Sequence, residues 1–541
     1  MPHAGSTDRI ARVAREAFGY EELRPGQHEA IEAALAGRDA LVVMATGSGK
    51  SAVYQIAALL TPGPTIVVSP LIALQRDQVE ELEERRAGGA VELNSTLSAE
   101  EREDALADLR EGALEFLYLA PEQFSDADLL ADLREAEPSL FVVDEAHCIS
   151  EWGHDFRPDY LRLGAVAAAL GRPPVLALTA TAAPPVRAEI HSRLHLRDPL
   201  EIVRGFDRPN IRLDVERFHD ERHKRRALVE RVIAAPKPGL LYVPTRAGAG
   251  EVAQALCDAG VGAAAYHAGL KAAEREAVQT RFMEDELDAV VATTAFGMGV
   301  DKPNVRFVYH DAPSDSLDSY YQELGRAGRD GEPAEAVLFY RPEDLGLRRF
   351  FAGSGQVDAD ELVHVAAVVK DEGGPVDAAT LREETELSRT KLATALTRLE
   401  DAGVVELLPT GDVAPGQSDD VEAAVESEED RQAFERSRVE MMRGYAEADA
   451  CRREVLLSYF GEPYEGPCAN CDVCERGEAV EHDASSEPFP LGARVTHPEW
   501  GEGVVQRYEP GQMVVLFESV GWRTLALDVV AERGLLAPAA G

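Results

Sequence analysis

The sequence predicts a protein of the α/β class, with two domains that each contain a parallel β-sheet, followed by helical and small β regions. Brief β-rich segments such as 40–44 and 140–143 alternate with longer segments of helical period, which is the pattern of βαβ units. The same alternation starts again after Arg204, for example at 239–243 and 305–309. At about 150 residues per domain, a chain of 541 residues has room for three or four domains.

The composition excludes several classes of protein. Hydrophobic residues make up 45% and charged residues 28%, an ordinary globular balance that excludes a wholly disordered or collagen-like chain. No apolar run is long enough for a transmembrane helix, and the first ten residues lack the pattern of a secretory signal. Six cysteines are too few for a disulfide scaffold. We therefore expect a cytoplasmic protein with no membrane partner.

The net charge of −42 is unusually acidic. A uniform field of that sign repels nucleic acid, although a local basic groove still releases counterions from phosphates. We therefore expect weak non-specific binding to DNA at low salt. Adaptation to high internal salt and a plain acidic composition both remain open as causes.

The region after residue 357 is predicted to begin with a winged-helix-like domain. Helices are expected over 358–371, 378–384 and 388–402, followed by a strand over 404–408. Arg389, Lys391 and Arg398 of the third helix either face duplex phosphates or lie on a domain that only packs against the rest of the protein. The sequence leaves both alternatives open.

The remaining C-terminal residues contain three further regions. Residues 411–430 carry eight acids and no base, so we predict a solvated linker. A helix is expected over about 431–459, and apolar and polar residues alternate between glycines over 488–536, which predicts a small β-barrel. The predicted domains are 1–204 and 205–352 for the two α/β domains, 356–410 for the winged-helix-like domain, 411–430 for the linker, 431–480 for a helical cysteine-rich module and 488–537 for the β domain.

A glycine-rich loop follows the first strand and opens a helix, where backbone N–H groups and the helix N-terminus favour a phosphate. Lys50 is expected to reach the β- and γ-phosphates of ATP, and Ser51 to hold Mg²⁺. Met44 stands where the strict pattern has glycine, so the loop is a variant. An ordinary glycine-rich turn is disfavoured by the preceding strand and by the acidic motif described next. The predicted phosphate-binding residues are Thr46, Gly47, Ser48, Gly49, Lys50 and Ser51.

An acidic motif, Asp144-Glu145-Ala146-His147, follows the apolar run 140–143. An acid at the carboxyl end of a strand can hold Mg²⁺ beside the nucleotide, and Glu145 can orient or deprotonate the attacking water. Alone, the pair would be interpreted as a solvated loop. Together with the phosphate loop, it predicts an NTPase.

Two arginines of the second α/β domain are candidates for arginine fingers. Arg326 and Arg329 are spaced i, i+3 within a glycine-flanked segment. From the second domain they could neutralise charge on the γ-phosphate. Plain surface arginines are the alternative.

Taken together, these motifs resemble the RecQ family of superfamily 2 DNA helicases. The resemblance implies two RecA-like lobes and an ATP-driven motor that unwinds DNA with 3′-to-5′ polarity. It further implies single-stranded and forked DNA as partners, a role in DNA repair and recombination, and a nucleoid-associated location in the cytoplasm. Besides the motifs above, the segments that carry it are 18–27, 146–160, 178–182, 266–270, 291–306 and 322–330.

The adenine base is expected at the first of these segments. Gln27 offers both a donor and an acceptor to the base, and Tyr20 or Arg24 could stack on it.

DNA is expected at the aromatic-rich segment 146–160. Trp152 and Phe156, with His154 and Arg157 nearby, can stack on unpaired bases and contact phosphate. Burial in the core is the usual fate of such aromatics, but glycine and proline interrupt this segment. The predicted coupling residues between DNA and ATP are His147, Thr179 and Thr181, and whether the threonines touch DNA is left open.

Four cysteines predict a structural Zn²⁺ site. Cys451, Cys468, Cys471 and Cys474 have the spacing C-x16-C-x2-C-x2-C, and four thiolates suit tetrahedral zinc without an open position. Free core cysteines are disfavoured because three of the four fall within seven residues. The arrangement resembles the zinc module of the RecQ family.

The C-terminal half departs from better-known members of the family, in which a winged helix follows the zinc module rather than preceding it. The tail around 497–505 resembles small Tudor- or SH3-like barrels. It is expected to dock a protein partner or to cap the fold. The alternatives to a helicase are a DNA-stimulated ATPase that remodels without unwinding, an RNA helicase and a non-catalytic scaffold.

Overall fold

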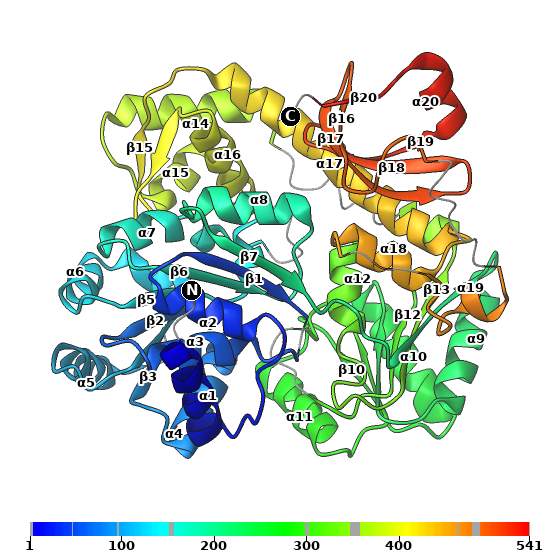
Figure 1. Ribbon diagram of the computed structural model, residues 1–541, viewed down its shortest axis with the longest axis horizontal. Coiled ribbons are helices and arrows are strands. Elements are labelled where there is room, and N and C mark those ends of the chain that lie inside the picture. The colour runs from blue at the N-terminus through cyan, green and yellow to red at the C-terminus, as the bar shows by residue number, and fades with distance from the viewer. Residues whose placement is uncertain are drawn as a thin grey trace. The chain divides into compact units, whose positions relative to one another are not determined.

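A computed structural model describes residues 4–45, 47–94, 97–150, 156–297, 302–346, 357–462, 464, 466–478 and 487–539 (Figure 1). The chain divides into two units. The first contains residues 1–205 and 355–429, and the second contains residues 206–354 and 430–541. Within the described ranges, no helix combines the length and the apolar character needed to cross a membrane.

The first unit contains a seven-stranded sheet with the order β3-β4-β2-β5-β6-β1-β7, and every pair in it is parallel. The inner strands are buried along their whole length, which is why the sequence shows them as continuous apolar runs. The strands are β1 (Ala40–Met44), β2 (Thr65–Val68), β3 (Ala90–Leu93), β4 (Phe116–Leu119), β5 (Leu140–Val143), β6 (Val175–Thr179) and β7 (Leu200–Arg204).

Helices surround this sheet. One face packs against α1 to α4, whose apolar residues share a core with Ala40, Val42 and Met44 of β1. The helices are α1 (Ala4–Phe18), α2 (Gln27–Leu35), α3 (Lys50–Ala58), α4 (Ile72–Arg85), α5 (Ala99–Arg110), α6 (Ala127–Glu135), α7 (Leu163–Ala169) and α8 (Pro184–Arg193), with the 3-10 turns η1 (Pro121–Ser125), η2 (Ala146–Ile149) and η3 (Pro158–Tyr160).

A separate small core in the first unit belongs to the block that resembles a winged helix. Its elements are α14 (Ala359–Glu372), α15 (Ala378–Thr385), α16 (Arg389–Asp401), β14 (Val405–Leu407) and β15 (Val413–Pro415). The three predicted helices and the first strand are present.

The predicted linker 411–430 differs from the structure. Val413–Pro415 forms β15, which pairs antiparallel with β14, and α17 (Val421–Glu447) begins inside the acidic run. Acids of this run have basic partners elsewhere in the block: Lys370 bonds Asp419 at 2.6 Å and Arg398 bonds Glu428 at 3.2 Å. Val413 and Ala424 of this segment are buried in the core of the block, so its apolar residues pack where the acidic composition predicted a linker.

The second unit contains a six-stranded parallel sheet with the order β10-β11-β9-β12-β13-β8. Its strands are β8 (Ile211–Arg217), β9 (Gly239–Tyr242), β10 (Ala263–Tyr266), β11 (Ala289–Ala292), β12 (Phe307–His310) and β13 (Ala334–Tyr340). Its helices are α9 (Glu221–Ala234), α10 (Arg246–Asp258), α11 (Ala272–Met283) and α12 (Leu317–Leu324), followed by the turn η4 (Pro342–Asp344).

The helix predicted over 431–459 is two helices. α17 ends at Glu447, and α18 (Arg452–Tyr459) starts directly after Cys451. The short helix α19 (Asp472–Glu475) follows.

The chain ends in a five-stranded antiparallel sheet with the order β19-β18-β17-β16-β20. Trp522 attaches it to the helices of the second unit: its ring stacks on Tyr459 at 4.7 Å, and its backbone N–H donates to the Ser437 hydroxyl at 3.2 Å. The elements are β16 (Arg494–His497), β17 (Gly501–Glu509), β18 (Gln512–Phe517), β19 (Gly521–Ala526), α20 (Leu527–Arg533) and β20 (Ala537–Pro538).

Candidate functional site

Three adjacent strands of the first unit present three of the predicted catalytic residues, Lys50, Asp144 and Glu145, at one edge of the sheet. β6 lies between β5 and β1, and all three run parallel. The phosphate loop follows β1, Asp144 follows β5 and Thr179 ends β6. The carboxyl edge of an open α/β sheet is where ligands bind in this class of fold.

The phosphate loop leads directly into the N-terminus of helix α3. Gly47 and Gly49 have a φ of 77°, the left-handed conformation that glycine adopts without a steric penalty. The helix α3 begins at Lys50 with no side-chain cap, so its first N–H groups remain suited to an anion. The Lys50 ammonium donates to the carbonyl of Met44 at 3.1 Å. Thr46, also predicted here, lies outside the described residues.

Gln27 and Arg24 hold this loop from the side. Gln27 is buried, and its amide nitrogen donates to the carbonyls of Gly49 at 2.8 Å and Ser48 at 3.1 Å. Its amide oxygen accepts the Arg24 N–H at 2.8 Å, and the Arg24 guanidinium donates to the Gly47 carbonyl. Contact with adenine would require Gln27 to exchange these protein partners.

Tyr20 lies at the rim of the core formed by α1 to α4. Its ring stacks on Phe18, with ring centroids 5.9 Å apart. Burial raises the pKa of the Tyr20 hydroxyl. Its predicted role at the base stays a prediction.

Asp144 and Glu145 form a sharp turn after β5. Glu145 has a φ of 48°, an uncommon conformation for a residue other than glycine that often marks active sites. Asp144 accepts the Glu145 N–H at 2.9 Å. Burial, and then the neighbouring Glu145 charge, raise the pKa of Asp144 to about 7, while Lys50 opposes the shift. A divalent cation would relieve this carboxylate repulsion, so the oxygen donors of Asp144 and Ser51 fit Mg²⁺.

His147 joins the acidic motif to the end of β6. Its Nδ1 lies 2.8 Å from the Thr179 hydroxyl and 3.3 Å from a carboxylate oxygen of Glu145. The Thr179 hydroxyl also lies 3.1 Å from the Thr181 carbonyl. His147, Thr179 and Thr181 are almost fully buried, so their side chains contact protein and have no surface to offer DNA in this conformation.

The aromatic-rich segment is described in part. Trp152 and His154 lie outside the described residues. Phe156 and Arg157 are half-buried, and the Arg157 guanidinium donates to the Pro70 carbonyl at 2.7 Å.

In the second unit, Arg326 and Arg329 follow α12. Arg326 is buried near Tyr242, whose pKa burial raises to about 12 while the Arg326 charge opposes the shift. Arg208 and Asn210, which are not among the predicted site residues, hold the loop that carries the two arginines. The Arg208 guanidinium donates to the carbonyls of Gly325 at 3.0 Å, Ala327 at 2.8 Å and Gly328 at 2.9 Å, and the Asn210 amide donates to Gly328 at 2.8 Å. No local pattern marks these two residues, because the carbonyls that they bind lie 117 and 118 positions away in the sequence.

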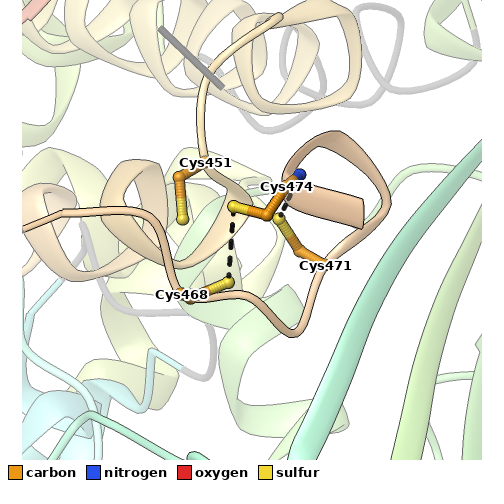
Figure 2. A group of neighbouring side chains, drawn as sticks. All are labelled: Cys451, Cys468, Cys471 and Cys474. Atoms are coloured by element: carbon orange, nitrogen blue, oxygen red, sulfur yellow. Dashed lines mark hydrogen bonds between the residues drawn. The ribbon is translucent and has the colours of Figure 1, made fainter. Parts of the chain in front are cut away.

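The four predicted zinc ligands converge (Figure 2). Their sulfur atoms all lie within 4.8 Å of one another, and Cys468 Sγ lies 3.9 Å from Cys474 Sγ. Tetrahedral zinc at about 2.3 Å from each sulfur requires sulfur separations of about 3.8 Å. The geometry therefore fits Zn²⁺ with four protein ligands, which is typical of a structural site.

The cysteine module covers the edge strand β8 of the second sheet. Leu213 donates its N–H to the Asn470 carbonyl at 3.3 Å, and Arg212 donates to both carboxylate oxygens of Glu475 at 2.9 and 2.7 Å. Within the module, buried Arg452 bonds both carboxylate oxygens of Asp472 at 3.0 and 3.1 Å. The module thus satisfies an edge that would otherwise expose unpaired backbone groups.

The structure favours packing over DNA contact for the third helix of the winged-helix-like block. Eight consecutive residues of α16, from Leu392 to Leu399, are buried. The three bases predicted to face DNA have acidic partners within the unit. These ion pairs are Arg389 with Asp159, Lys391 with Glu361 and Arg398 with Glu428.

Comparison with known proteins follows the same division of the chain. The family model for the DEAD/DEAH box helicase matches residues 24–189, the helicase conserved C-terminal domain matches residues 223–331, and RecQ zinc-binding matches residues 415–475. The probable ATP-dependent DNA helicase RecS of Bacillus subtilis is 35% identical over 467 residues, which cover 86% of this chain and 91% of the relative. The chain belongs to the RecQ family.

Other RecQ relatives are longer. ATP-dependent DNA helicase RecQ of Haemophilus influenzae is 38% identical over 85% of this chain, and this chain spans 63% of that relative. Among solved structures, the Mycobacterium smegmatis helicase Lhr bound to ssDNA and AMP-PNP has a TM-score of 0.49 at 20% identity, over 89% of this chain and 67% of that one. The three RecQ and helicase family matches leave residues 332–414 uncovered.

Proposed function

We propose that the protein is an ATP-dependent DNA helicase that couples ATP hydrolysis to translocation on single-stranded DNA and to duplex unwinding, with 3′-to-5′ polarity. The observation that carries this proposal is the convergence of the phosphate loop, Asp144 with Glu145, and the His147–Thr179 contact at one edge of the first sheet. Relatives that this chain partly covers are named ATP-dependent DNA helicases. These names describe the relatives, and we propose the same activity for this chain.

In the proposed site, each residue at this edge has a distinct role. Lys50 and the N–H groups of α3 bind the phosphates, and Ser51 with Asp144 hold Mg²⁺. Bound Mg²⁺ would neutralise charge on the phosphate oxygens. Glu145 orients the attacking water and accepts its proton.

The remaining predicted residues complete the nucleotide site in the proposal. Arg326 and Arg329 supply positive charge to the γ-phosphate as arginine fingers do. Gln27, Arg24 and Tyr20 contact the base, and the first two release the loop carbonyls when they do so.

For DNA, the proposal assigns Trp152, His154, Phe156 and Arg157 to contact with single-stranded bases and phosphates. His147, Thr179 and Thr181 transmit that contact to the carboxylates. The family membership supports forked DNA as substrate, DNA repair and recombination as context, and a nucleoid-associated location in the cytoplasm. The C-terminal β domain is proposed to dock a protein partner.

A translocase that remodels DNA without unwinding is the second candidate. The burial of α16 favours it, because the helix that reads duplex DNA in other winged helices is covered here.

The Lys50→Ala variant tests the catalytic assignment. We expect DNA-stimulated ATP hydrolysis in the wild type and a loss of at least about a hundredfold in the variant, because a charged phosphate contact is removed. Binding to oligo(dT) should persist, since the proposed DNA contacts lie elsewhere. Equal hydrolysis by both proteins would contradict the assignment, and loss of DNA binding together with hydrolysis would indicate misfolding or a wrong site.

A further inference from the structure

The winged-helix-like block, residues 357–429, packs against the segment that follows the aromatic-rich loop. In Figure 1 its helix α16 lies beside α8 of the same unit. The helix α16 is buried from Leu392 to Leu399, and Leu392, Leu396 and Leu399 belong to the core of the block. A cavity of about 270 Å³ between the block and Pro158–Arg162 is lined by Leu392, Ala393 and Leu396.

Arg162 fastens the hairpin of the block to the first unit's α/β domain. It is 6% exposed, and its guanidinium donates to the Pro121 carbonyl at 2.8 Å and the Ser125 hydroxyl at 2.8 Å. The same guanidinium donates to the Thr410 carbonyl, in the turn between β14 and β15, at 2.9 Å. Gly411 is required beside it: its φ is +89°, and a Cβ there would lie 2.7 Å from the Arg162 guanidinium.

Ion pairs fasten both ends of α16. At its start, Arg389 bonds Asp159 of η3 at 2.7 Å. At its end, Glu400 and Asp401 bond Arg193 of α8 at 3.1 and 2.9 Å. These contacts fix the block against two segments of the α/β domain.

The segment held in this way also contacts the backbone of the proposed catalytic residues. Tyr160 lies between Asp159 and Arg162, is fully buried, and donates its hydroxyl to the Asp144 carbonyl at 3.1 Å. The Arg157 N–H donates to the Cys148 carbonyl at 2.9 Å. The segment 157–162 therefore has the block on one side and the backbone of the acidic motif on the other.

We propose that the winged-helix-like block is a strut that positions the segment 157–162 and thereby sets how strongly DNA stimulates ATP hydrolysis. Arg162, Arg389 and Asp159 are its positioning residues. This inference rests on the proposed function and adds to it a role for the block. A block that served stability alone would alter the melting temperature and leave the response to DNA unchanged.

Charge exchange across the Arg389–Asp159 pair tests the strut with little risk to folding. Arg389 is 67% exposed, and an acid at the first turn of α16 suits the helix dipole. Arg389→Asp should lower the DNA-stimulated kcat about threefold, within the range of a partly exposed ion pair. Adding Asp159→Arg should recover part of the loss, because it restores the pair with residue 389 but removes the carboxylate that lies 3.7 Å from Arg162. The matched control is Lys370→Asp, which breaks an exposed ion pair inside the same block and should change nothing.

Arg162→Ala provides the larger effect. We expect the oligo(dT)-stimulated kcat to fall about tenfold, equivalent to about 1.4 kcal/mol of lost positioning. The rate without DNA and the KM for ATP should stay within about twofold, a split that a general loss of fold would not produce. Thermal unfolding shows whether this variant folds, and the charge exchange decides the matter if it does not.

If oligo(dT) stimulates ATP hydrolysis equally in the wild type and in every folded variant, the role of the block as a strut is wrong. The proposed function would then still stand. A wild-type protein whose hydrolysis does not respond to oligo(dT) would overturn the proposed function, and with it this inference.

Discussion

At the scale of single residues, the Thr179 hydroxyl joins two motifs that are 32 positions apart in the sequence. It contacts His147 in the turn η2 and the backbone carbonyl of Thr181, and all three side chains are buried. Removing one partner of a buried hydrogen bond leaves the other with the full cost of its desolvation. His147 contacts both Thr179 and Glu145, so we expect a movement at the end of β6 to change the position of the acidic motif.

Substitution of Thr179 by valine tests this coupling. Thr179→Val keeps the shape of the side chain and removes the hydroxyl, so we expect unwinding per ATP hydrolysed to fall about tenfold while hydrolysis without DNA persists. Thr65→Val is the control, because the buried Thr65 hydroxyl at the start of β2 makes no hydrogen bond to the described residues. Unchanged coupling in Thr179→Val would contradict the role given to His147.

The residues of this edge were predictable because each follows a strand in a recognisable local pattern. Lys50, Asp144 and the cysteine ligands all depend on short-range spacing. Arg208 and Arg162 were not predictable, because they act through carbonyls 117 and 248 residues away, which no local pattern contains.

At the scale of elements, the conformation of the loop after α12 depends on a residue directly before the strand β8. The loop after α12 carries Arg326 and Arg329, and Arg208 satisfies three of its carbonyls. Basic side chains that bind the last carbonyls of a helix stabilise its end. Arg208 thus acts on the proposed arginine fingers through the backbone.

Arg208→Ala should lower kcat for ATP about tenfold with less than about twofold change in KM, because the arginine-bearing loop loses its support. Arg208→Lys should recover part of the loss, since an ammonium cannot satisfy three carbonyls in the same way. Arg226→Ala, which breaks an exposed ion pair with Glu230, serves as control. A normal kcat in Arg208→Ala would show that the loop after α12 keeps its conformation without Arg208.

The cysteine module is the second element whose geometry makes a prediction. Cys471→Ser should lower bound zinc and reduce the melting temperature by more than about 5 °C, since the metal supplies folding energy and the module covers β8. Cys257→Ser is the control, because Cys257 is exposed and lies outside the cluster. Zinc content is measured by metal analysis, and equal content in both variants would refute the site.

Element boundaries show where local composition misleads. The acidic segment 411–430 resembled a linker, yet it contains β15 and the start of α17, because its apolar residues Val413 and Ala424 are buried in the core of the block. The single helix expected over 431–459 is interrupted near Cys451, whose position is set by the cysteine cluster rather than by helix propensity.

At the scale of the whole molecule, a protein with a net charge of −42 is proposed to bind DNA, which is also negatively charged. Long-range repulsion between the protein and DNA weakens as salt rises, while contacts with phosphates weaken as well. A salt series therefore accompanies any test of DNA-dependent activity.

The most direct measurement is unwinding of a duplex with a 3′ single-stranded tail and of its twin with a 5′ tail, with ATP and Mg²⁺ across that salt series. We predict ATP-dependent opening of the 3′-tailed duplex alone, and none by Lys50→Ala. DNA-stimulated hydrolysis with no opening of either duplex at any salt would contradict the helicase and leave the translocase.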